Sequence, residues 1–136
     1  MIWGAVAIAC LAAYAQVASH LGDTHAAELL YEKLTPTSGL LAYSVVLALG
    51  AMDHHLATLS RFELAERHFA DAEATHARIR APAWLARTRL EWARMLHTRR
   101  QPGDAQRARE LRGQALATAR ELGLAKVERD AVDLLQ

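Results

Sequence analysis

The chain has 136 residues, of which 52% are hydrophobic, and its formal net charge at pH 7 is +1. This length is enough for one compact domain with a buried core. Because 16 Lys and Arg residues nearly balance 15 Asp and Glu residues, no global field draws the chain to nucleic acid or to an acidic membrane surface. The composition therefore predicts neither a nucleic-acid partner nor a membrane partner.

The single cysteine, Cys10, excludes an internal disulfide framework and favours a cytoplasmic location. It lies in an apolar run, and we expect it to be buried as a small hydrophobic residue.

The first segment, 1–22, contains no Asp, Glu, Lys or Arg, and we expect one apolar helix over 2–20. It lacks the basic start of an export signal and is short for a membrane span. A helix that is apolar all round is usually buried, but the next helix can cover only one of its sides. The sequence therefore predicts a homodimer with Trp3, Val6 and Tyr14 at the interface.

Six further helices are expected, and no segment alternates with period two, so no strand is predicted. Pro82 suits a helix start, Asp104 an N-cap and Gly123 a C-cap. The expected helices span 23–34, 38–58, 61–79, 82–99, 104–122 and 125–135.

One pattern occurs three times in the sequence. It consists of an alanine, a larger side chain four residues later, and a small or apolar residue three residues after that. The copies are Ala27/Tyr31/Leu34, Ala65/Phe69/Ala72 and Ala108/Arg112/Ala115. Small residues let the second helix of a hairpin approach the first closely, and each hairpin then needs a neighbour to cover its other face. The pattern predicts one all-α domain over 1–136 with hairpins at 2–34, 38–79 and 82–122 and a capping helix at 125–135.

These positions resemble the tetratricopeptide signature. In that signature the first helix of a hairpin, helix A, carries an aromatic residue or Leu, and the turn carries Gly. The second helix, helix B, carries Ala, an aromatic residue and Ala in that order. The last unit matches it with Trp92, Gly103, Ala108 and Ala115, and the middle unit with Leu49, Ala65, Phe69 and Ala72. Arg112 stands where an aromatic is usual and Ser60 where Gly is usual.

Several longer segments are similar to the tetratricopeptide-like C-terminal region of bacterial signalling regulators of the LuxR type and the ATPase-cyclase type. They are LLYEKLTP (29–36), RFELAERHFADA (61–72), WLARTRLEWARML (84–96) and TARELGL (118–124). The resemblance implies a scaffold that senses or docks a partner. It implies nothing about ATP here, because the chain has no Gly-x4-Gly-Lys-Ser/Thr phosphate loop.

If the repeats superpose, Gln16, His54 and His97 occupy equivalent places on successive first helices, which line the concave groove of tetratricopeptide arrays. Arg61 and Arg100 would lie near its rim. A polar line in an apolar groove suits a peptide carboxylate or a small polar ligand. Solvated groove residues without a ligand explain the same pattern equally well.

The histidines do not have metal-ligand spacing, because no HExxH or equivalent i,i+4 pair exists and His68 and His76 are eight residues apart. We therefore predict no metal and no cofactor, while enzymatic activity stays open. The alternative is a small hydrolase or lyase, cofactor-independent or metal-dependent, in the groove or at the dimer interface. Its base would be His54, His55 or His97, acting with Asp53 or Glu91. Glu91 has arginines at helical spacing, Arg87 and Arg94, so the other expectation is that both carboxylates form surface salt bridges.

Overall fold

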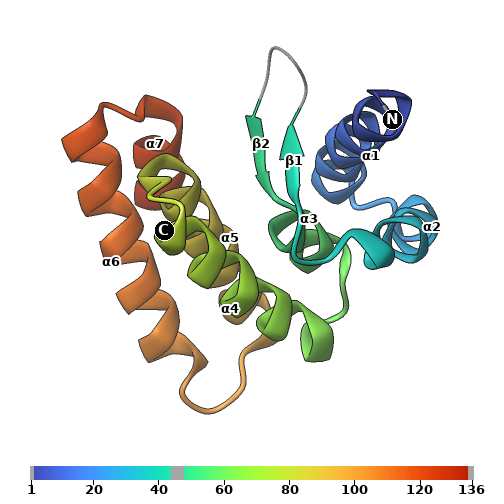
Figure 1. Cartoon of the computed structure of the whole chain (residues 1–136). Coiled ribbons are helices and arrows are strands. Elements are labelled where there is room, and N and C mark those ends of the chain that lie inside the picture. The colour runs from blue at the N-terminus through green and yellow to red at the C-terminus, as the bar shows by residue number, and fades with distance from the viewer. Residues whose placement is uncertain (1, 44–47, 135–136) are drawn as a thin grey trace. The chain divides into compact units, whose positions relative to one another are not determined.

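The computed structural model describes residues 2–43 and 48–134, and within them the side chains of 4, 7–40 and 50–134. Seven α-helices make up most of this part of the chain (Figure 1). The predicted all-α class with seven helices is therefore confirmed, whereas a tetratricopeptide-like arrangement stays a prediction. The chain divides into two compact units, Met1–Thr75 and His76–Gln136, where the sequence predicts one domain.

The first unit begins with the helices α1 (Ile2–Leu21) and α2 (Thr24–Leu34), which pack against each other. Gly22 ends α1 in a left-handed conformation at φ 67°, which glycine adopts without steric cost. Asp23 then caps α2, because its carboxylate accepts a hydrogen bond from the backbone N–H of Ala26 at 3.0 Å.

The helix expected over 38–58 is the main correction to the predicted secondary structure. A 3-10 turn η1 (Thr35–Thr37) is followed by two short antiparallel strands, β1 (Leu41–Tyr43) and β2 (Ala48–Ala51), and the helix α3 covers only Met52–Leu59. Gly39 and Gly50 have φ values of 81° and 80°, which a continuous right-handed helix cannot accommodate. The expectation of no strand is wrong at this hairpin.

The core of the first unit is built on the alanine side of α1. Ala12, Ala15 and Ala18 are buried with residues of α2 and α3, including Leu34 and Leu56. Small residues bring α1 close to its neighbours and leave larger apolar side chains outside.

Tyr14 is 65% exposed and Val17 54% exposed. Cys10, expected to be buried, is also exposed. The side chains of Trp3 and Val6 lie outside the described residues.

The helix α4 (Phe62–Arg78) runs across the boundary of the two units, and the second unit continues with α5 (Pro82–Arg99), α6 (Asp104–Leu122) and α7 (Ala125–Asp133). The helices α5 and α6 form an antiparallel hairpin against which α7 packs (Figure 1). Its core is rich in alanine and consists of Ala86, Leu90, Ala115, Ala119, Val127 and Ala131. Among the described residues, no helix has both the length and the apolar character needed to cross a membrane.

Candidate functional site

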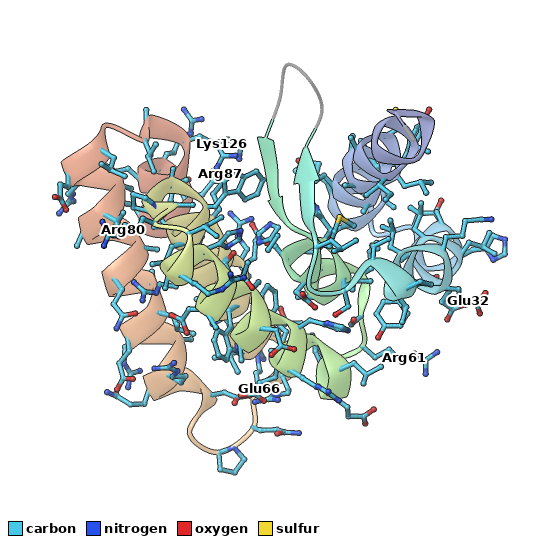
Figure 2. The ribbon with its side chains drawn as sticks, in the orientation of Figure 1. Glu32, Arg61, Glu66, Arg80, Arg87 and Lys126 are labelled. Carbon is cyan, nitrogen blue, oxygen red and sulfur yellow. The ribbon has the colours of Figure 1, made fainter. Side chains whose placement is uncertain are left out.

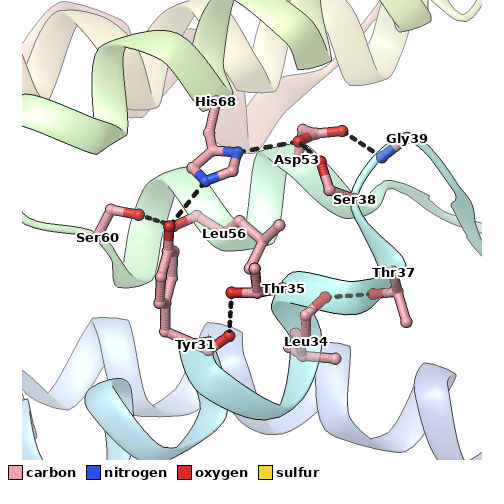
Figure 3. Close-up of polar contacts among 10 residues, drawn as sticks. All are labelled: Tyr31, Leu34, Thr35, Thr37, Ser38, Gly39, Asp53, Leu56, Ser60 and His68. Atoms are coloured by element: carbon pink, nitrogen blue, oxygen red, sulfur yellow. Dashed lines mark hydrogen bonds and ion pairs between the residues drawn. The ribbon is translucent and has the colours of Figure 1, made fainter.

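A buried carboxylate organises the polar centre of the first unit. Asp53, in the first turn of α3, is 1% exposed. Its Oδ1 accepts a hydrogen bond from the Ser38 hydroxyl at 2.8 Å, and its Oδ2 accepts one from the Gly39 backbone N–H at 2.8 Å (Figure 3). These two bonds attach the segment between η1 and β1 to the start of α3.

The same carboxylate contacts a histidine from α4. The Nδ1 of His68 lies 2.9 Å from Asp53 Oδ1, and its Nε2 lies 3.0 Å from the Tyr31 hydroxyl on α2 (Figure 3). An ionised carboxylate can only accept hydrogen bonds. With neutral His68, the Nδ1–H therefore donates to Asp53 and Nε2 accepts the proton of the Tyr31 hydroxyl.

Hydrogen bonds keep Asp53 in its ionised form. Burial by itself raises the pKa of this carboxyl, but the hydrogen bonds from Gly39, Ser38 and His68 outweigh it. The pKa of Asp53 therefore lies below its ordinary value of 3.8. The Asp53 carboxylate is therefore a buried anion in contact with the His68 imidazole.

A second carboxylate lies close to this pair. Asp71, exposed on α4, places an oxygen within 4.8 Å of a ligand atom of both Asp53 and His68. One imidazole nitrogen and two carboxylate oxygens thus converge, and each is a group that binds divalent cations.

This network corrects the sequence interpretation of Asp53 as a surface salt-bridge residue. Tyr31 and His68 were not predicted as site residues, and their separation from each other by 37 positions gave no local signal. Only the i,i+3 spacing of His68 and Asp71 on one helix could have indicated the site.

The histidines predicted as bases in the alternative enzyme hypothesis are not part of this network. His54 and His55 are buried, at 6% and 0% exposure, and their rings contact each other edge to face. Glu91 forms an ion pair with Arg94 at 2.8 Å, as its helical spacing predicts. The carboxylate of Asp53 binds His68 instead of one of the predicted bases.

The second unit has an open depression of about 300 Å³ where α5 ends and α6 begins. It is lined by Leu96, His97, Arg100, Gln101 and Ala105. The predicted ligand-binding residues His97 and Arg100 therefore share one surface feature. Among the described residues, neither the His97 side chain nor the Arg100 side chain forms a hydrogen bond or an ion pair.

A salt bridge fixes the turn beside this depression. Arg99 donates two hydrogen bonds to Asp104, from Nε at 2.9 Å and from Nη2 at 2.7 Å, and the Gln101 N–H donates to the same carboxylate at 2.8 Å. The hydrogen bond from Arg99 is the largest cause that lowers the pKa of Asp104 below 3.8. Arg100 adopts a left-handed conformation at φ 57°, and its side chain is exposed.

The other predicted groove residues belong to the first unit. Gln16 is exposed on α1 and His54 is buried on α3. Arg61, labelled in Figure 2, is exposed. Its Nη2 forms an ion pair with Glu28 Oε1 at 3.4 Å. A common groove shared with His97 and Arg100 stays a prediction. The burial of His54 nevertheless differs from the open groove position expected for it.

Comparisons of the chain with protein-family models, curated proteins and solved structures found no match. The resemblance to tetratricopeptide-like regulators therefore rests on the sequence positions alone.

Proposed function

We propose that the chain is a protein-interaction module that binds a carboxylate-bearing peptide segment at the α5–α6 depression. One observation carries this proposal. His97 and Arg100 are exposed beside the apolar side chains of Leu96 and Ala105, in an open depression of about 300 Å³.

The chemistry of these residues favours a carboxylate over other ligands. A guanidinium presents paired N–H donors that match the two oxygens of a carboxylate. Ala105, which is exposed, supplies apolar contact beside it. The volume lies at the lower limit of small-molecule pockets, which are about 300–1,000 Å³, so the C-terminal carboxylate of a peptide fits better than an enclosed cofactor. The proposed module needs no cofactor.

The hairpin that carries the depression supports a scaffold role. Ala108 and Ala115, two of the positions that resemble the tetratricopeptide signature, are buried at 1% and 0% exposure on α6. Small buried side chains at these positions permit close helix pairing. We extend the proposal to a cytoplasmic role in bacterial signalling, as the resemblance implies.

We also propose that the protein is a homodimer through α1. Tyr14 and Val17 are exposed, and the described side chains of this helix carry no Asp, Glu, Lys or Arg. An uncharged helix face with large exposed apolar residues is typical of an interface.

The carboxylate proposal is tested with short peptides that have free C-termini and with the same peptides amidated, by fluorescence anisotropy. Peptides that bind should lose affinity on amidation. Arg100→Gln should weaken binding about tenfold to hundredfold, the value of a charge-assisted hydrogen bond. Arg129→Gln, which changes an exposed arginine on α7, is the matched control. Equal affinity of free and amidated peptides would refute the proposed chemistry.

A further inference from the structure

We propose that Asp53, His68 and Asp71 form a binding site for one divalent transition-metal ion. This site lies in the first unit and is independent of the peptide-binding proposal.

The backbone already holds the three groups together. His68 and Asp71 are three residues apart on α4 and therefore project from the same side of the helix. Asp53 comes from the first turn of α3 and contacts His68. All three ligand atoms lie within 4.8 Å of one another.

Asp53 and His68 need little movement to bind one ion between them. Two ligands at metal–ligand distances of roughly 2.0–2.2 Å stand about 3.3–3.6 Å apart around a common tetrahedral ion. His68 Nδ1 and Asp53 Oδ1 are already 2.9 Å apart. A metal ion would take the place of the proton that these two atoms now share.

The charge of the site favours a cation. Asp53 is buried, and within the described residues its partners are Ser38, Gly39 and His68, with no Lys or Arg among them. Burying a carboxylate away from water is costly unless a positive charge compensates for it. A metal ion would supply that charge.

The surrounding hydrogen bonds suit metal ligands. Ligating histidines usually donate their second ring N–H to a fixed acceptor, and ligating carboxylates are themselves hydrogen-bonded. Tyr31 lies 3.0 Å from His68 Nε2, and Ser38 and Gly39 hold Asp53. A hydroxyl can both donate and accept. Tyr31 can therefore donate to Nε2 in the metal-free protein and accept from Nε2–H when a metal occupies Nδ1.

The ligand set selects the class of ion. One imidazole and two carboxylates suit Zn²⁺, Co²⁺ or Mn²⁺, whereas Ca²⁺ and Mg²⁺ prefer oxygen ligands alone. Asp71 is exposed, which gives the ion a path from solvent. Three protein ligands leave further coordination positions for water.

The test is titration of the full chain with Zn²⁺ by calorimetry and with Co²⁺ by visible absorption. We expect one saturable equivalent and a rise in melting temperature, because binding to the native state stabilises it. Asp71→Asn should weaken binding at least about tenfold, since it removes one ligand. Glu63→Gln removes an exposed carboxylate in the first turn of α4, about two turns from Asp71, and should bind like the wild type.

Either of two outcomes would overturn the site: no one-equivalent binding phase, or equal affinity in the wild type and Asp71→Asn. The chain has seven histidines, and binding by the others would persist in Asp71→Asn. Circular dichroism establishes that Asp71→Asn is folded, as its exposed position leads us to expect. Tyr31→Phe should also reduce affinity, by about 10–100-fold.

Discussion

Replacing Ala115 with leucine tests the close packing of the α5–α6 hairpin. Ala115 is completely buried on α6 and shares a core with Ala86 and Leu90 of α5. Three additional carbon atoms at this position must displace a neighbouring helix or force a strained rotamer, which costs about 1–3 kcal/mol. For a unit of this size, each kcal/mol lowers the melting temperature by about 4–8 °C. Differential scanning calorimetry should therefore show a decrease of at least about 4 °C.

The matched control is Ala117→Leu, the same change at an exposed position of the same helix. Its side chain projects into solvent, so its effect on stability should stay within about 0.5 kcal/mol. Equal melting temperatures for Ala115→Leu and Ala117→Leu would refute the close helix pairing. Circular dichroism of both variants checks that helix content is retained, because leucine and alanine are both strong helix formers.

Three further predictions follow from other parts of the structure. Ala72→Leu, at a fully buried position of α4, should destabilise the protein by about 1–3 kcal/mol, whereas Ala70→Leu at an exposed position should not, as measured by chemical denaturation. Because the pKa of Asp53 is lowered in the folded state, this carboxylate contributes its full stabilisation above pH 3.8 and loses it as the pH falls through the folded-state pKa. In Asp53→Asn, the free energy of unfolding should therefore change less with pH in this acid range. Light scattering should show that Val17→Glu dissociates the proposed dimer and that Ser19→Glu leaves it intact. A monomer mass for the wild-type protein would contradict the dimer proposal.

The sequence determined most helix boundaries, because local chemistry sets them. The expected helices 82–99 and 104–122 coincide with α5 and α6. Pro82 fits the first turn of a helix, and Gly103 and Gly123 adopt left-handed conformations at helix ends. These signals act within a few residues, so no tertiary information was needed.

The segment 38–58 shows where local reasoning fails. Its apolar composition is compatible with a buried helix and with a hairpin alike, since periodicity cannot separate the two for such a run. In the structure, Leu41 pairs with Ala51, and the Met52 N–H donates to the Leu40 carbonyl at 2.9 Å. Contacts between distant residues therefore decided this segment.

The polar site of the first unit depended on tertiary structure most of all. Tyr31, Asp53 and His68 come from three helices, and Asp53 gives no sign in the sequence that it is buried. Helical spacing can relate His68 to Asp71 because they share α4. Only the tertiary structure brings the Tyr31 hydroxyl and the Asp53 carboxylate to the same imidazole. The sequence determined which side chains can share a helix face, and the fold decided which faces meet.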